Sequence, residues 1–134
     1  MLYQLAKKLR RSKRGQSLVE IALILPILLI ILFGILEFGR VFHSYLVITH
    51  AAREGARYGI ISKDAAQIKQ KVQDASPGIT LDLSDIDVNP STNLTAGVPL
   101  TISVEYEVDL FTPLLAGIIP NPITISTSST MRVE

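Results

Sequence analysis

The hydrophobic and polar positions divide the chain into a continuous apolar run and a longer patterned region. The run Ile21–Leu36, "IALILPILLIILFGIL", has no charged residue. A helix rises about 1.5 Å per residue, so this run covers about 24 Å, and its extension to Leu18–Gly39 covers about 33 Å. The longer stretch crosses a hydrocarbon core of about 30 Å. Because the run is apolar on all sides, it favours a membrane span over a buried helix of a soluble protein.

Helical spacing continues beyond the run. Glu37 and Arg40 are three residues apart, which is the spacing of an ion pair on one helix face. An apolar stripe with the same periodicity follows, formed by Phe38, Val41, Phe42, Tyr45, Leu46, Ile48 and Thr49. We therefore predict one helix over residues 16–61, with a transmembrane part and a protruding stalk.

Small residues gather at the end of this predicted helix. They are Ala51, Gly55 and Gly59 at intervals of four, with Ala52 and Ala56 beside them. Small residues at this interval let two helices approach closely, which predicts a packing face for another subunit. Glycine also ends helices, and this second interpretation stays open, especially for Gly59.

Charged residues border the small-residue face. Arg53 and Arg57 are four apart, with Glu54 between them. They are candidates for ion pairs between subunits, although an exposed, hydrated helix face has the same pattern.

Residues 62–134 have the pattern of a small head. A short amphipathic helix is predicted over Lys63–Ala75, with Asp64 and Gln67 placed as in a capping box. Alternation follows, first in "ITLDL" and "DIDV", then most regularly in "LTISVEYEVDLF", and last from Ile123 to Val133. Such alternation is typical of an antiparallel sheet with one buried face and one solvated face. The predicted class is α+β, with a sheet of about three strands packed on a helix.

The connection before the last strand, "TPLLAGIIPNP", is unusually apolar for a loop. Leu114, Leu115, Ile118 and Ile119 either fill the core of the head or form a surface patch. The partner of such a patch is a neighbouring subunit or the membrane surface.

The charge distribution predicts the orientation in the membrane. The net charge is +1, but six basic residues precede the run, namely Lys7, Lys8, Arg10, Arg11, Lys13 and Arg14, and Glu20 is the first acidic residue. The remaining 7 basic and 12 acidic residues give the rest of the chain a charge of −5. Loops rich in lysine and arginine stay in the cytoplasm, so the head is predicted to be extracytoplasmic. The acidic body argues against a nucleic-acid partner.

The sequence contains few candidates for catalytic or metal-binding residues. No combination of nucleophile, base and acid is recognisable, and the chain has no cysteine. Asp82, Asp85 and Asp87 lack the glycine and the final glutamate of a calcium loop, and His43 and His50 have no third ligand nearby. We expect a protein that is not an enzyme and that carries no cofactor and no metal.

A secretory signal peptide is an alternative for the N-terminal segment. Its peptidase requires small residues after the apolar core, whereas "GILEFGRVFHSYL" is large and aromatic at this point. We therefore expect the apolar segment to be retained.

Three motifs carry a resemblance to a known family. In "RGQSLVEIALILP" a glycine follows the basic residues and a glutamate comes five residues later, which resembles the cleavage site of type IV prepilins. Together with "EFGR" and "THAAREGARYG", the segment resembles TadE-like proteins, minor pilin-like (pseudopilin) components of tight-adherence, or Flp-type, pilus systems.

The resemblance implies a maturation step. Residues 1–15 are then a prepilin-type leader, removed after Gly15 by a prepilin peptidase so that Gln16 becomes the new N-terminus. Glu20 is then expected to meet the cationic N-terminus of a neighbouring subunit. Without such a partner, Glu20 simply lies among the lipid headgroups.

The resemblance also implies partners and a location. The implied partners are membrane lipid, the prepilin peptidase, other pilin-like subunits and the inner-membrane pilus assembly platform. The implied location is the cytoplasmic membrane, or a surface pilus after assembly. The alternative function is an uncleaved, single-pass anchor that carries an extracytoplasmic binding or adaptor domain.

Overall fold

The computed structural model describes residues 13–134. Its first element is helix α2, Lys13–Ser62, which contains Pro26 without interruption. The predicted long helix is therefore confirmed, and it continues through Gly55 and Gly59. Most of the basic leader predicted at residues 1–15 lies outside the described residues.

The N-terminal part of α2 is apolar on every side. Its large side chains, from Leu18 to Leu36, are exposed. An 18-residue stretch with a mean hydropathy of 3.0 has no residue buried within the structure. This helix is long and apolar enough to cross a membrane.

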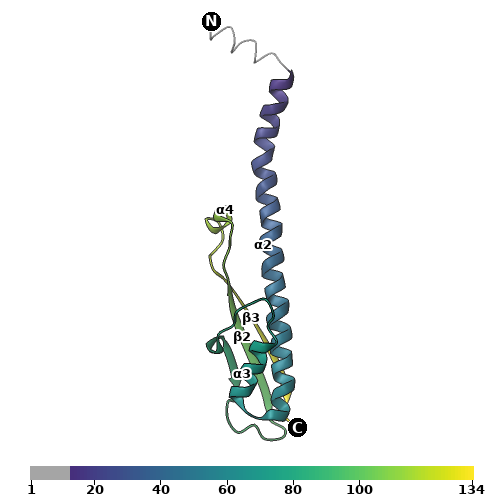
Figure 1. The fold of residues 1–134 in the computed structure, drawn as a ribbon, viewed down its shortest axis with the longest axis vertical. Helices are drawn as coiled ribbons and strands as arrows, with labels where there is room; N and C mark the ends of the chain where they lie inside the picture. The colour runs from purple at the N-terminus through teal and green to yellow at the C-terminus, as the bar shows by residue number, and fades with distance from the viewer. Residues whose placement is uncertain (1–12) are drawn as a thin grey trace. The chain divides into compact units, whose positions relative to one another are not determined.

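The head is an α+β unit, as the sequence predicted. After α2 come helix α3, Ala65–Asp74, and a 3₁₀ turn η1, Leu83–Asp85. Strands β1, Ile86–Asn89, and β2, Pro99–Val108, follow, and the short helix α4, Pro113–Ala116, leads to strand β3, Ile123–Arg132. The strands form one antiparallel sheet in the order β1-β2-β3 (Figure 1).

The register gives the sheet two different faces. Ile102 of β2 lies opposite Val88 of β1 and Ser129 of β3, on the face that is packed. The next residue, Ser103, lies opposite Asp87 and Ser128 on the other face. The predicted alternation of buried and solvated positions is therefore present in the central strand.

Two local predictions differ from the structure. The segment "ITLDL" is not a strand, because Leu81 enters the core from a loop and Leu83 is exposed at η1. Asp64 caps α3 by accepting from the Ala66 N–H at 2.9 Å. Gln67 donates its amide to the Asp64 carboxylate at 3.0 Å, in place of the reciprocal backbone bond of a capping box.

The core forms where the end of α2, α3 and the sheet meet. Figure 1 shows α3 and the last turns of α2 alongside the strands. The fully buried residues include Ile48 of α2, Ile68 and Val72 of α3, and Ile102 and Val104 of β2. The compact unit that contains the sheet consequently begins at Glu37 rather than at residue 62, since the second half of α2 supplies part of its core.

Candidate functional site

A buried carboxylate marks the start of the head unit. Glu37 is 6% exposed, although it follows directly on the apolar run. One of its oxygens, Oε1, accepts hydrogen bonds from the backbone N–H of Phe111 at 2.8 Å and of Thr112 at 3.0 Å. The Thr112 hydroxyl donates to the same oxygen at 3.0 Å. The second oxygen, Oε2, pairs with Arg40 at 2.7 Å.

Arg40 completes this arrangement. Its guanidinium also donates to the backbone carbonyl of Asp109 at 3.2 Å. The same guanidinium lies over the ring of Phe111, 4.0 Å from the ring centroid. Contacts between arginine and an aromatic face are attractive because the face carries partial negative charge. We call Glu37, Arg40, Phe111 and Thr112 the α2 latch.

The α2 latch joins parts of the chain that are more than 70 residues apart in sequence. A buried carboxylate is costly unless donors surround it, and here four donor groups share its two oxygens. The latch therefore holds the start of the β2–β3 connection against α2. The sequence predicted the pair between Glu37 and Arg40, but the backbone donors were missed because amide groups leave no signal in a residue pattern.

The β2–β3 connection is partly buried and partly exposed. Leu110 and Leu115 are each 8% exposed, whereas Phe111 and Ile118 are 76% and 75% exposed. Ile119 is also exposed, at 41%. Both interpretations of the apolar loop therefore hold in part, since some of its residues pack inward and others form a surface.

The predicted processing residues lie in the first turns of α2. Gly15 is partly exposed, and both Gln16 and Glu20 are exposed. The Gln16 side-chain amide donates to Glu20 at 3.3 Å. Glu20 thus stands on an open face of the helix, in contrast to the enclosed Glu37.

The predicted small-residue face is occupied by the chain's own head. Its five members are buried, namely Ala51, Ala52, Gly55, Ala56 and Gly59. A methyl group on Gly55 would overlap the Val72 side chain of α3, and one on Gly59 would overlap Leu100 of β2. The small residues do permit a close approach, as predicted, but α3 and β2 make that approach in place of another subunit. These five residues are therefore not on the surface that the folded head offers to a neighbour.

The other charged and ionisable candidates of the stalk, after the latch residues, are at its surface. Arg57 pairs with Glu54 of the same helix at 2.8 Å, and Arg53 is exposed. His43 and His50 are exposed as well. Within residues 13–134, no group of three His, Cys, Asp or Glu side chains is arranged to hold a metal ion.

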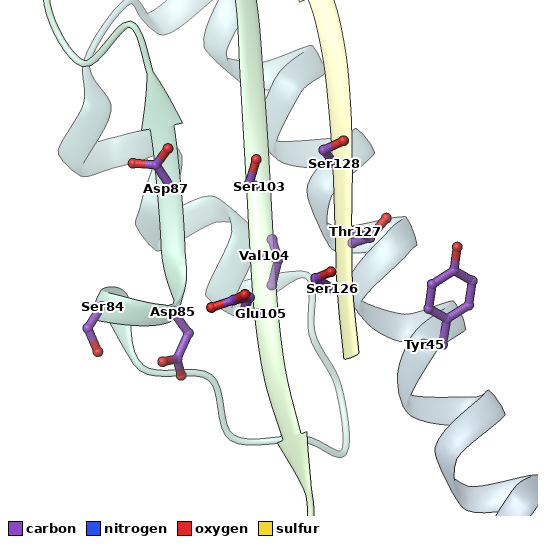
Figure 2. A pocket seen from close by; sticks show the side chains of 10 residues that line it. All are labelled: Tyr45, Ser84, Asp85, Asp87, Ser103, Val104, Glu105, Ser126, Thr127 and Ser128. Atoms are coloured by element: carbon purple, nitrogen blue, oxygen red, sulfur yellow. The ribbon is translucent and has the colours of Figure 1, made fainter. Parts of the chain in front are cut away.

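The solvated face of the sheet carries a shallow, open depression (Figure 2). Its polar lining comes from all three strands and includes Asp87, Ser103, Glu105, Ser126 and Ser128. The strand register explains why these polar side chains lie together, because Ser103 is paired with Ser128 and Glu105 with Ser126. The arrangement is that of the solvated face of an antiparallel sheet.

Comparison with protein families gives a match for the N-terminal part of the chain. Residues 15–57 match the model of the family described as TadE-like protein. The matched segment includes Gly15 and Glu20, and also Glu37 and Arg40 of the "EFGR" motif. Comparison with curated proteins and with solved structures gave no match. The N-terminal segment, residues 15–57, is thus similar to the TadE-like family, and the helix that contains it is long and apolar enough to span a membrane.

Proposed function

We propose that the chain is a minor pilin-like structural subunit for assembly of a tight-adherence pilus, and that a prepilin peptidase cleaves it after Gly15. The observation that carries the proposal is the family match over residues 15–57. This match begins at the glycine after which cleavage is predicted, and it extends through the apolar run. The proposed role is structural rather than enzymatic, and it requires no cofactor and no nucleic acid.

The exposure of Glu20 supports a role in assembly. A charged side chain within a membrane helix costs about 2.5–3.5 kcal/mol at the helix centre, and such residues usually have a partner. Cleavage after Gly15 creates a cationic α-amino group on Gln16. Because Glu20 lies on an open helix face, a neighbouring subunit is able to bring its own N-terminus to this carboxylate.

The exposed stripe of the stalk supports contact with other subunits. Phe38, Phe42 and Leu46 are 72%, 52% and 51% exposed. The rings of Phe38 and Phe42 are stacked, with centroids 6.2 Å apart. We assign subunit packing to this stripe, since the small residues further along α2 are covered by the head.

The proposed location is the cytoplasmic membrane, with the N-terminus in the cytoplasm, the head on the other side, and later incorporation into a surface pilus. The proposed partners are membrane lipid, the prepilin peptidase, other pilin-like subunits and the inner-membrane assembly platform. Basic residues before the run and their scarcity directly after it support this orientation.

Co-expression with the peptidase tests the proposal. The chain is expressed with an active or an inactive prepilin peptidase of a tight-adherence system, and the product is analysed by intact mass and N-terminal sequencing. We expect a product that starts at Gln16 with the active enzyme. We also expect Gly15→Ala to be cleaved, at most more slowly, and Gly15→Leu to stay uncleaved, because a bulky side chain obstructs the site.

The inactive peptidase is the control for unrelated proteolysis. A chain that keeps residues 1–14 in the presence of the active peptidase contradicts the proposal and favours the alternative, an uncleaved membrane-anchored binding or adaptor domain. Equal cleavage of Gly15→Leu and the unchanged chain also argues against a prepilin site.

A further inference from the structure

The β2–β3 connection presents an uncharged, apolar surface. From Leu110 to Met131 the sequence contains no Asp, Glu, Lys or Arg. Buried Leu110 and Leu115 anchor the connection, while Phe111, Ile118 and Ile119 are exposed. We call these three residues the apolar tip. Exposed apolar residues gathered on one segment are typical of an interaction surface.

The α2 latch fixes where the root of this connection lies. Phe111 and Thr112 donate their backbone N–H groups to Glu37. Glu37 follows Leu36, the last residue of the uncharged run. When the run occupies the hydrocarbon core, Glu37 lies at the boundary between lipid and water. Phe111 is then at the same boundary, within one side-chain length of Glu37.

The side chains around the latch match the chemistry of that boundary. Arginine near the end of a span places its apolar stem toward the acyl chains and its charge among the headgroups. Arg40 has a side chain that is 39% exposed and lies over the Phe111 ring. The stretch without charged residues begins after Asp109, so no charged side chain from Leu110 onward in the connection opposes contact with lipid.

Because the root of the connection lies beside Glu37, at the end of the uncharged run, we propose that the apolar tip inserts into the boundary between headgroups and acyl chains. The occupant of this surface is thus lipid, and the head has a second membrane contact besides α2. Two contacts, at α2 and at the tip, hold the head in one orientation to the membrane surface while the subunit awaits assembly. The inference rests on α2 spanning a membrane, as the proposed function requires.

Tryptophan fluorescence in the full-length chain tests this contact, since the chain contains no tryptophan. Three single variants are reconstituted in vesicles of phosphatidylcholine and phosphatidylglycerol: Ile118→Trp in the tip, Leu29→Trp in the span, and Ile61→Trp near the end of α2. Ile61 is the matched control, because it is also an isoleucine and is 80% exposed. Phosphatidylcholine brominated near the headgroup or deep in the chain serves as the quencher.

We expect shallow bromines to quench most of the Ile118→Trp emission, and deep bromines to quench it less. Leu29→Trp shows the reverse order, and Ile61→Trp keeps its emission in both lipids. If Leu29→Trp is quenched while Ile118→Trp behaves like Ile61→Trp, the tip is in water and the inference is refuted. The quenching of Leu29→Trp would still support a membrane-spanning α2. Blue-shifted but unquenched Ile118→Trp emission also refutes it, since the tip is then covered by protein.

Discussion

The two glutamates that flank the apolar run have opposite surroundings. Glu20 is exposed and receives a side-chain hydrogen bond from Gln16. Glu37 is buried and is satisfied by donors from its own helix and from the β2–β3 connection. A satisfied carboxylate stabilises the fold in which it lies, whereas an open one is available to a partner. The same residue type thus has a structural role at one end of the run and a proposed assembly role at the other.

The first prediction concerns Glu37. Replacement Glu37→Gln keeps the side-chain shape but removes the charge that attracts Arg40 and strengthens the bonds from Phe111 and Thr112. We expect a loss of about 1.5–3 kcal/mol in the free energy of unfolding, the range for hydrogen bonds to a charged group. The measurement is equilibrium denaturation of the full chain in detergent, followed by near-ultraviolet circular dichroism.

Glu54→Gln is the matched control. Glu54 also pairs with an arginine three residues later, at 2.8 Å, but this pair is at the surface. Exposed ion pairs add little to stability, so Glu54→Gln should leave the denaturation midpoint unchanged. Equal effects of the two replacements would mean that the α2 latch contributes nothing beyond an ordinary surface pair.

At the scale of elements, helix α2 has two parts with different environments. Its N-terminal part is exposed on all sides, and its C-terminal part is packed by α3 and β2. The glycines follow this division, because a Cβ atom on Gly34 or Gly39 would meet nothing within 4 Å, whereas Gly55 and Gly59 lie against side chains of the head. Gly55 and Gly59 of α2 are therefore required by close packing against the head.

The second prediction follows from this contrast. Gly55→Ala should lower the free energy of unfolding by about 1–3 kcal/mol, the usual cost of overpacking, because the valine at position 72 is stiff about its first side-chain torsion. Gly39→Ala, the control in the open part of the helix, should be neutral or stabilising by up to about 1 kcal/mol. Thermal denaturation in the same detergent measures both, and a neutral Gly55→Ala would contradict the packing described for α2 and α3.

At the scale of the whole molecule, the chain combines an apolar helix that is able to span a membrane with a head that has its own core. The buried core residues all lie between Ile48 and Val133, within the compact unit that begins at Glu37. The uncharged run contributes none of them, so it is free to interact with lipid or with other helices. A helix able to span a membrane and a folded head are thus encoded in separate stretches of sequence.

The third prediction concerns orientation. The chain has no cysteine, so Ser12→Cys and Ser91→Cys each introduce a unique thiol, before the run and in the head. In spheroplasts that lack the peptidase, a membrane-impermeant maleimide should label Ser91→Cys and not Ser12→Cys. Both thiols should react after detergent lysis, which is the control for reactivity. Labelling of Ser12→Cys in intact spheroplasts would contradict the proposed orientation and place the N-terminus outside the cytoplasm.

Much of the fold could be predicted from the sequence, because the patterns that indicate helices and strands are local. The run Ile21–Leu36, the alternation of β2 and the spacing of Glu37 and Arg40 each reflect the geometry of one helix or strand. The family motifs at Gly15, Glu20 and "AAREGAR" are also local, and the match over residues 15–57 confirms the resemblance that they carry. A pattern along the chain reports which face of an element is apolar, and this was sufficient for the fold class.

The partners of those faces were decided by the tertiary structure. The face of Ala51, Gly55 and Gly59 suits any close neighbour, and sequence periodicity cannot distinguish a second subunit from α3 and β2 of the same chain. Glu37 likewise finds its donors in backbone amides of Phe111 and Thr112, which any residue type supplies. Sequence therefore determined the elements and their apolar sides, while long-range packing decided what each side meets, because such contacts depend on how distant segments close in space.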